Sequence, residues 1–343
     1  MKGRIIVSTL LALLLLVSMP MSALAATWDI GKGDITVNAE SGGQTVRQGG
    51  GAAVPDSAPV ITGTSKENNV TINAESGQTA SVTLSGVNID VRDKGKAAVS
   101  TTGEGNVSIE LNGESTLRSG YEHAGLEKNN GGSLTIADED KNGKLTAWGG
   151  QQGAGIGGGS GKDGSNIFIT GGGVNAIGGL AAAGIGGGLG GNGSNITISG
   201  GKVGATNGLN GAGIGGDSSA GIGGGHTGDG SDITISGGEV SASGGENGAG
   251  IGGGVYGKGE GITVSGNAQL KVRGGSVHGD YGTGAGIGGG GSYGTDGAEV
   301  EPDICALNPG GKIEYYAPRK PMSGTPNKTV TNPTGDLYGT AAG

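Results

Sequence analysis

The stretch GAGIGGGSGKDGSNIFITGGGVNAIG, residues 153–178, decides the fold because its parts recur at a constant spacing. Ile156 and Ile185 are 29 residues apart. The same step separates Ile185 from Ile214, Ile222 from Ile251, Ile167 from Ile196 and Ile233 from Ile262. Eight extra residues around 214–225 and seven before Ile287 leave the phase intact, as insertions into the loops of a repeat protein do.

Each repeat carries apolar-x-apolar triplets between glycine turns, and a period of two predicts β-strands. Such short strands fit one wall of a coil, and the small side chains fit a narrow interior. We therefore predict an all-β fold, a single-stranded parallel β-helix with coils of about 29 residues. Residues at equivalent positions should stack in two ladders, Ile167, Ile196, Ile233 and Ile262 beside Ile169, Ile198, Ile235 and Val264.

The chain divides by composition into segments of different regularity. Residues 26–148 carry the same triplets without the glycine-isoleucine loops, which predicts irregular rungs continuous with the regular array at 149–297. Prolines and the pair Tyr315-Tyr316 predict a C-terminal cap over 298–320. The tail at 321–343 is expected to be a linker or disordered.

The first residues predict export from the cytoplasm. A basic start with Lys2 and Arg4, an apolar run over 5–17 and the site Ala23-Leu24-Ala25 are typical of a signal peptide over 1–25. The apolar run is too short to cross a bilayer, so no membrane insertion is expected. The mature chain should be secreted, extracellular or attached to the cell surface.

Composition and charge exclude several classes of protein. Glycine supplies 86 of 343 residues, but nine prolines and no G-X-Y period exclude collagen. Removing Lys2 and Arg4 with the signal peptide takes the formal net charge from −9 to −11, which excludes binding to nucleic acid through phosphate neutralisation. Cys305 is the single cysteine and cannot form an internal disulfide, so a buried thiol in the cap is expected.

Two motifs in the glycine-rich loops suggest ligands. The pattern G-x-G-x-x-G begins at Gly153, but its repetition and the lack of a following helical period exclude a nucleotide site. Residues 190–195 and 228–232 partly resemble the calcium-binding nonapeptide. The candidate calcium ligands are Asp163, Asp229, Asp232 and Asp296. The alternative is that these side chains only shape turns through hydrogen bonds to the backbone.

Catalysis finds little support in the sequence. A polysaccharide lyase or hydrolase would need a carboxylate pair or an assisted base. His123, His226 and His278 are far apart in the sequence, and the carboxylates are scattered over variable loops. No catalytic residue and no cofactor is therefore predicted, although a site assembled across rungs stays an alternative.

The order of the triplets carries a family resemblance. Residues 82–91, 107–113 and 117–120 lead into the glycine-isoleucine repeats. This arrangement, over about residues 68–297, resembles the glycine-rich repeat regions of surface proteins of Gram-positive bacteria. It is more distantly similar to the clostridial carbohydrate-binding parallel β-helix family, which implies binding of plant-wall polysaccharide and calcium. Where that family has acidic residues near the metal, this chain has Gly-Ile-Gly-Gly-Gly.

The loops that follow each glycine-isoleucine motif vary most between repeats. They comprise residues 160–163, 189–192, 226–229, 256–258 and 292–293, and we call them the loop column. Stacked loops on one side of a repeat scaffold can carry specificity. The predicted ligand is a polysaccharide or cell-wall glycan lying across the rungs. Its candidate binding residues are Lys162, His226, Asp229, Tyr256, Lys258 and Tyr293, and Tyr281 is a further aromatic residue in the late loops.

Two other functions remain open. The repetition alone also suits a structural or adhesive surface protein without a small ligand. Thr197, Thr234 and Thr263 form an outward column that could bind ice, but Phe168 interrupts it.

Overall fold

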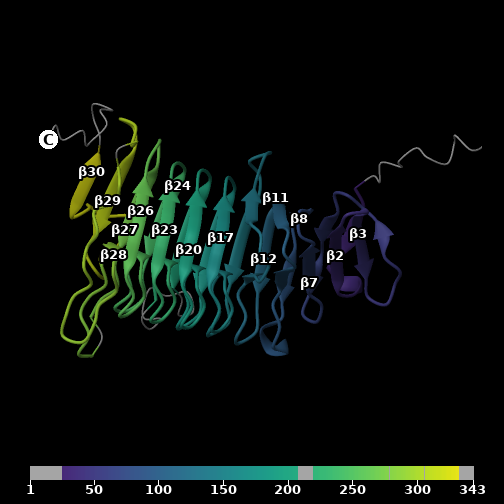
Figure 1. The fold of residues 1–343 in the computed structure, drawn as a ribbon, viewed down its shortest axis with the longest axis horizontal. Coiled ribbons are helices and arrows are strands. Elements are labelled where there is room, and N and C mark those ends of the chain that lie inside the picture. Colours follow the sequence, from purple (N-terminus) through teal and green to yellow (C-terminus); the bar gives the residue numbers. More distant parts are fainter. Residues whose placement is uncertain (1–24, 208–218, 278, 305, 332–343) are drawn as a thin grey trace, which may run out of the picture.

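The protein forms an elongated stack of strands, shown in Figure 1 as a computed structural model. The structure describes residues 25–207, 219–277, 279–304 and 306–331. Residues 1–24 of the predicted signal peptide (1–25), His278 and Cys305 lie outside these residues, as does the repeat copy around Ile214. Within the described residues the helical elements are two 3-10 turns, η1 (Ile30–Lys32) and η2 (Arg92–Lys94). Among these residues, no helix has the length and apolar character needed to cross a membrane.

Three long and mostly parallel sheets make up the fold. Sheet 1 runs in the order β1 (Thr27–Asp29), β5 (Val60–Thr62), β8 (Thr79–Ser85), β11 (Asn106–Asn112), β14 (Leu134–Ala137), β17 (Gly164–Ile169), β20 (Gly193–Ile198), β23 (Gly230–Ile235) and β26 (Gly259–Val264). Sheet 2 runs in the order β28 (Ile287–Gly288), β25 (Ile251–Gly252), β22 (Ile222–Gly223), β19 (Ile185–Gly186), β16 (Ile156–Gly157), β13 (Leu126–Lys128), β10 (Val99–Thr102), β7 (Val70–Ala74), β2 (Ile35–Glu40), β3 (Gly43–Gln48) and β4 (Val54–Pro55). Sheet 3 runs in the order β30 (Lys328–Thr331), β29 (Lys312–Tyr316), β27 (Gln269–Arg273), β24 (Glu239–Ser243), β21 (Lys202–Asn207), β18 (Gly173–Gly178), β15 (Lys144–Trp148), β12 (Glu114–Arg118), β9 (Asn88–Asp90) and β6 (Thr64–Ser65). The predicted all-β class is confirmed.

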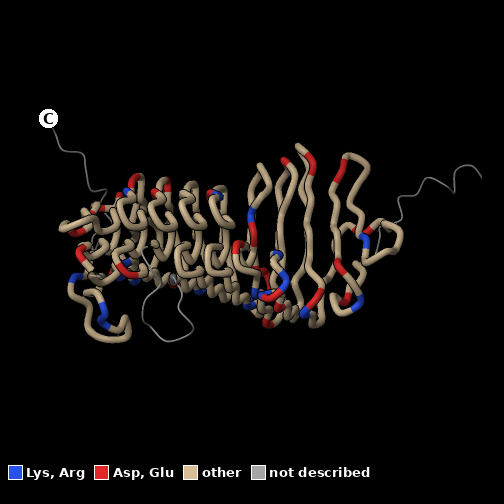
Figure 2. The backbone as a smooth tube through the Cα atoms, turned by 90° about the horizontal axis from the view of Figure 1, so that it is seen from below, with Lys and Arg blue, Asp and Glu red and all other residues tan. Residues whose placement is uncertain are grey.

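Each repeat adds one strand to each sheet, in the order sheet 2, sheet 1, sheet 3. The repeat that supplies β16, β17 and β18 is followed by the repeat that supplies β19, β20 and β21, and the two pair in parallel. We call one such set of three strands a rung. This arrangement is consistent with a β-helix-like solenoid, and its sheets run without a break from the irregular N-terminal rungs into the glycine-rich array. Charged residues thin out along the glycine-rich rungs (Figure 2).

The eight extra residues in the array leave the pairing in register. Ile185 pairs with Ile222, 37 positions further on, and Ile222 pairs with Ile251 after the ordinary step of 29. The eight extra residues between β19 and β22 therefore do not alter which residues of sheet 2 oppose each other.

The interior consists of stacked apolar columns. Both predicted ladders are confirmed by the pairing of β17, β20, β23 and β26. Their members are almost completely buried, whereas Phe168 and Thr197 between them are half-buried on the outer face of sheet 1. Isoleucine, valine and alanine suffice because three short strands enclose a narrow space, and their burial is the main stabilising term.

The glycine-isoleucine loops require glycine because backbone packs against backbone. A Cβ at Gly187 would lie 2.1 Å from the carbonyl oxygen of Gly191. Gly223 adds a backbone φ of +128°, which residues with side chains rarely adopt, and its Cβ would lie 2.1 Å from Gly252 O. The motif therefore needs glycine because backbone atoms come close together both within a rung and between rungs.

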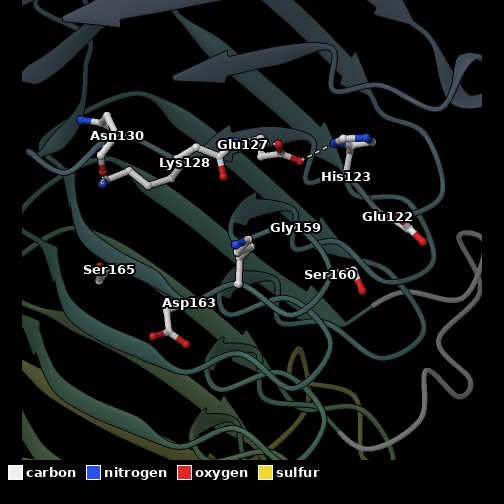
Figure 3. A pocket seen from close by; sticks show the side chains of 11 residues that line it. Glu122, His123, Glu127, Lys128, Asn130, Gly159, Ser160, Asp163 and Ser165 are labelled. Carbon is white, nitrogen blue, oxygen red and sulfur yellow. Dashed lines mark hydrogen bonds and ion pairs between the residues drawn. The ribbon is translucent and has the colours of Figure 1, made fainter. Parts of the chain in front are cut away.

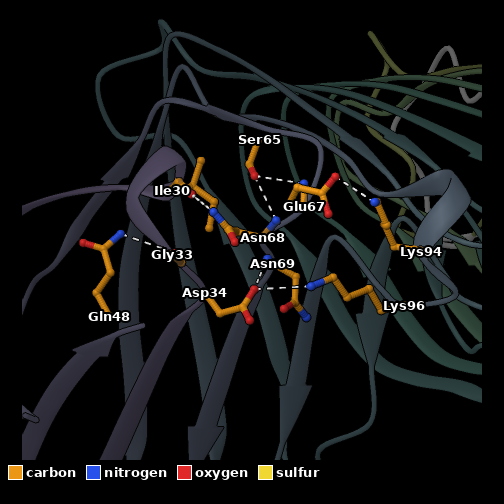
Figure 4. Close-up of polar contacts among 10 residues, drawn as sticks. All are labelled: Ile30, Gly33, Asp34, Gln48, Ser65, Glu67, Asn68, Asn69, Lys94 and Lys96. Atoms are coloured by element: carbon orange, nitrogen blue, oxygen red, sulfur yellow. Dashed lines mark hydrogen bonds and ion pairs between the residues drawn. The ribbon is translucent and has the colours of Figure 1, made fainter. Parts of the chain in front are cut away.

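The N-terminal end is closed by polar contacts (Figure 4). Strands β2, β3 and β4 form an antiparallel extension of sheet 2. Asp34 Oδ1 accepts a hydrogen bond from Asn69 N at 2.8 Å and contacts Lys96 Nζ at 3.3 Å, so one carboxylate ties three rungs together. Asn68 Nδ2 donates to Ile30 O at 2.8 Å.

The C-terminal end is covered by the segment after β28. Val264 N donates to Asp303 O and Gly266 N donates to Ala306 O, both at 2.8 Å, so this segment satisfies the open edge of sheet 1. Strand β29 continues sheet 3. Within the segment from 321 that was expected to be a linker or disordered, Lys328–Thr331 forms β30 and pairs antiparallel with β29. Four residues, Lys328–Thr331, are too few to show an alternation of polar and apolar residues in the sequence.

The ladder assignment makes a testable pair of variants. Ile198→Asp places a carboxylate in the fully buried column, so the free energy of unfolding should fall by several kcal/mol, about 3 or more. Thr197→Asp, one residue away on the outer face, should cost less than about 1 kcal/mol. Urea unfolding followed by circular dichroism measures both, and equal losses would contradict the assignment of inner and outer faces.

A second pair tests the need for glycine. Gly187→Ala should destabilise by about 3 kcal/mol because its methyl group meets a backbone carbonyl that cannot move freely. Gly204→Ala is the control, since Asn175, Ser241 and Lys271 occupy the same column on sheet 3. This change should be neutral or stabilise by about 0.5–1 kcal/mol. Thermal unfolding of both variants provides the comparison, and a mild effect at Gly187 would refute the backbone-contact argument.

Candidate functional site

The predicted loop column is present on one edge of the stack, where sheet 2 turns into sheet 1. Gly161 N donates to Leu189 O at 2.9 Å, Gly190 N donates to His226 O at 3.0 Å and Tyr256 N donates to Gly291 O at 3.1 Å. The loops therefore lie one above another. Of the predicted binding residues, Lys162, Asp229, Tyr256, Lys258 and Tyr293 are exposed and His226 is half-buried.

Asp and Asn side chains of the column connect each loop to the next by hydrogen bonds. Asp163 Oδ1 accepts a hydrogen bond from Asn192 N at 2.8 Å, and Asn192 Oδ1 accepts one from Asp229 N at 2.8 Å. Asp229 Oδ1 in turn accepts one from Lys258 N at 2.7 Å. Each side chain thus satisfies a backbone donor of the next rung, which is the turn-shaping role considered for these residues.

The other two candidate calcium ligands are Asp232 and Asp296, and Asp296 accepts a hydrogen bond from the backbone. Asp232 has a φ of +52° and stands in a column of left-handed residues with Asn166 and Asn195. Asp296 Oδ1 accepts hydrogen bonds from Thr283 N at 2.7 Å and Thr283 Oγ1 at 2.9 Å, which lower the pKa of that carboxyl. Within the described ranges, no three residues among His, Cys, Asp and Glu are grouped so that they could hold a metal ion.

Three tyrosines gather at the C-terminal end of the column. Tyr281 lies between Tyr256 and Tyr293, with ring centroids 5.7 Å and 6.1 Å apart and interplanar angles of 84° and 86°. The rings meet edge to face, the favourable geometry for aromatic pairs. All three are exposed, by 55% for Tyr256, 36% for Tyr281 and 67% for Tyr293. The predicted residues Tyr256 and Tyr293 are thus brought together, and Tyr281 joins them from a different loop.

Polar contacts hold this tyrosine cluster in place. Asn247 Nδ2 donates to Gly282 O at 2.8 Å and Tyr281 O at 3.3 Å, which fixes the loop of Tyr281. Tyr256 has a φ of +61° at the position that Gly161, Gly190 and Thr227 occupy in earlier rungs. A left-handed backbone at a bulky residue costs about 1 kcal/mol or more, so the exposed ring of Tyr256 is held outward against local strain.

A pocket of about 620 Å³ opens at the N-terminal start of the glycine-rich array (Figure 3). Its walls are the segment 122–130 and the next loop at 159–165. The lining residues are Glu122, His123, Glu127, Lys128, Asn129, Asn130, Gly159, Ser160, Lys162, Asp163 and Ser165. Lys162 and Asp163 were predicted from the loop column, whereas the group around Glu127 was missed.

Register explains why the pocket lies at this place. Glu127 pairs with Gly157, so the rung of β13 carries Leu-Glu-Lys where all later rungs carry Ile-Gly-Gly. The change from charged to glycine residues at one position of the repeat is the sequence signal that could have identified the pocket.

Glu127 is 7% exposed and orients His123. Its Oε2 lies 2.8 Å from His123 Nδ1 and accepts a hydrogen bond from Ala124 N at 3.0 Å. Its Oε1 accepts a hydrogen bond from Asn129 Nδ2 at 2.7 Å. A buried carboxylate with three contacts fixes the imidazole ring at the wall of the pocket (Figure 3).

Lys128 brings a buried amino group to the same wall. Its Nζ donates to the backbone oxygen of Asn130, and Asn130 is itself held by Thr101 Oγ1 at 2.7 Å and by Gly105 O at 2.8 Å. Burial lowers the pKa of Lys128 to about 8, while the negative charge of Glu104 acts in the opposite direction.

Comparison with family models, with curated proteins and with solved structures finds no match for the chain.

The pKa of Lys128 gives a pH-dependent prediction. Between pH 8 and its unperturbed value of 10.5, the unfolded chain binds a proton that the folded chain does not, so the contribution of Lys128 to stability rises with pH. The free energy of unfolding of the wild type should therefore improve relative to Lys128→Met between pH 7 and pH 10, measured by urea unfolding.

Lys144→Met provides the control for this measurement. Lys144 pairs with Glu114, whose hydrogen bond raises the lysine's pKa, so its contribution is present at pH 7 and declines only at higher pH. The free energy of unfolding of the wild type should not increase relative to that of Lys144→Met between pH 7 and pH 10. If the difference in the free energy of unfolding between the wild type and Lys128→Met does not change with pH, the lowered pKa of Lys128 is contradicted.

Proposed function

We propose that the chain is a secreted or cell-surface module that binds a polysaccharide along one edge of a single-stranded parallel β-helix. The observation that carries the proposal is the cluster of exposed tyrosines on the loop column, Tyr256, Tyr281 and Tyr293. Neither catalysis nor a cofactor is part of the proposal.

The order of the strands supports the β-helix. Consecutive segments join sheet 2, sheet 1 and sheet 3 in turn, and the cycle repeats with parallel pairing from β7 to β27. Coils of about 29 residues then place one loop of the column at every turn, separated by about 4.8 Å, the spacing of paired strands. A chain molecule lying across the rungs meets a new loop at each step.

The chemistry of exposed tyrosine supports a sugar ligand. An aromatic ring presents a flat apolar face and a hydroxyl group, and it has few rotatable bonds to immobilise on binding. Sugar rings have apolar C–H faces and hydroxyl edges that match such a surface. The strained backbone of Tyr256 supports a functional role, because glycine at the same position in two other rungs, Gly161 and Gly190, adopts this conformation without strain, and only Thr227 shares the cost.

A glycan array probed with residues 26–343 tests the proposal. Tyr256→Ala combined with Tyr293→Ala should weaken binding to the identified glycan on the order of tenfold, which corresponds to about 1.4 kcal/mol. The melting temperature should stay nearly unchanged because both rings are exposed.

Phe168→Thr is the control, since it removes an aromatic ring from the outer face of sheet 1 and reproduces the residue at Thr197. Binding by this variant should equal that of the wild type. Full binding by the double tyrosine variant, or an array without any bound glycan, would overturn the proposal and favour the structural or adhesive alternative.

A further inference from the structure

We propose that the pocket between 122–130 and 159–165 is a second sugar site for the same polysaccharide, and that this polysaccharide is uncharged. The inference rests on the proposed function, because it assigns the tyrosine cluster and the pocket to two ends of one ligand. It adds a site, a ligand class and a minimum length of ligand.

The two sites lie on the same edge of the molecule. Ser160 and Lys162 belong to the first loop of the column, and Ser292 and Tyr293 belong to the fifth. The backbone hydrogen bonds of the column connect these loops in order. Four rung steps of about 4.8 Å separate them, or about 19 Å in total. A single sugar residue cannot reach from one site to the other, whereas an extended oligosaccharide can.

The pocket has the size and the polar groups of a sugar site. Its volume of about 620 Å³ falls within the range of about 300–1,000 Å³ that holds small ligands. Carboxylates accept hydrogen bonds, ammonium and amide groups donate them, and serine hydroxyls do both. Glu122, Asn129, Ser160 and Lys162 together offer these types on one lining. A sugar residue carries several hydroxyl groups, each of which donates and accepts, so it suits such a mixture.

An exposed aromatic ring lies next to this pocket. Tyr121 is 52% exposed, and its hydroxyl accepts a hydrogen bond from Gln152 Nε2 at 3.4 Å. Gln152 Oε1 in turn accepts a hydrogen bond from Ser160 Oγ, a pocket residue, at 2.9 Å. Tyr121 is outside the pocket lining, but two hydrogen bonds through Gln152 connect it to Ser160, so a sugar bound in the pocket has an exposed aromatic ring beside it.

Hydrogen bonds within the protein hold the wall of the pocket in place. Glu127 and Asn130 are more than nine-tenths buried, and each makes several hydrogen bonds within the protein. Ligand binding therefore costs little reorganisation, which favours affinity.

The charges around the pocket favour an uncharged ligand. Glu122, Glu127 and Asp163 outnumber Lys128 and Lys162, so the lining carries a small excess of negative charge. The whole chain has a formal charge of −9, which repels a polyanion at long range. An acidic sugar would also meet the exposed carboxylates of Glu122 and Asp163. These charges should favour the binding of neutral glucans, xylans or mannans over that of polyuronates.

The length of the ligand gives the first test. Oligosaccharides of increasing length, prepared from the glycan identified on the array, should show a step in affinity once they exceed about 19 Å. Two linked sites bind with an avidity on the order of 10²-fold above one site. Affinity that rises smoothly, without a step, would overturn the two-site inference. Binding of polyuronate as tight as that of neutral glycans would overturn the ligand class.

Paired variants give the second test. Glu122→Ala combined with Lys162→Ala alters two exposed side chains of the pocket and leaves the net charge unchanged. This variant should show no step in affinity. It should bind long oligosaccharides on the order of 10²-fold more weakly than the wild type does, with the affinity that the wild type has for short ones. Glu114→Ala combined with Lys144→Ala is the matched control, because it removes the same residue types from sheet 3. The control should keep the step.

The outcomes separate the two proposals. If the tyrosine double variant loses binding but the pocket variant equals the wild type at every length, the pocket inference fails and the proposed function stands. If no neutral or acidic glycan binds to the wild type, the proposed function fails. A crystal soaked with the long oligosaccharide should show sugar density in the pocket and against the tyrosines, and density at the tyrosines alone would contradict the second site.

Discussion

The fold depends on hydrogen bonds between equivalent backbone groups of neighbouring rungs. In the glycine-rich loops, Gly158 N donates to Gly186 O, Gly187 N to Gly223 O and Gly224 N to Gly252 O, all at 2.9 Å. Such contacts bring consecutive loops so close that a Cβ atom would meet a carbonyl group. The chain therefore uses glycine at these positions for steric reasons, and accepts the greater loss of backbone entropy on folding.

This constraint moves chemically active side chains into a few places. The outer face of each glycine-isoleucine strand offers no room for a side chain, so variation collects in the loop column. Even there, the side chains of Asp163, Asn192 and Asp229 hold the turns, because each accepts a hydrogen bond from a backbone N–H group of the next rung. Only part of an apparently polar and variable surface is therefore free to recognise a ligand, and the tyrosines stand out as side chains held away from the coil.

The pocket arises where the packing changes from one kind of rung to another. Rungs before β14 carry larger side chains, and Glu127 and Lys128 still occupy their strand when the next rung has turned to glycine. At this corner, Glu127 of one rung lies opposite Gly157 of the next, which has no side chain to pack against it. The space between them is lined by the buried groups of the first rung and the exposed groups of the second, which gives a mixed polar surface.

Much of the architecture was determined by the sequence alone. The 29-residue step and the period of two predict strands, parallel stacking and the two inner ladders, because a repeat that buries the same face at each turn must stack in register. The loop column and the positions of Tyr256 and Tyr293 on it follow from the same periodicity. The short strand β30 was not predicted, since four residues give no periodic signal and pairing with β29 decides their conformation.

Only the tertiary structure decided how side chains from different rungs combine. Tyr281 reaches the cluster from another loop, and Lys162 meets His123 and Glu127 around one pocket although it follows Glu127 by 35 residues in the sequence. It also decided that Asp163, Asp229 and Asp296, three of the candidate calcium ligands, accept hydrogen bonds from backbone donors within 3 Å. Periodicity specifies which residues share a column, whereas distances across neighbouring columns depend on the paths of the loops, which no repeat length encodes.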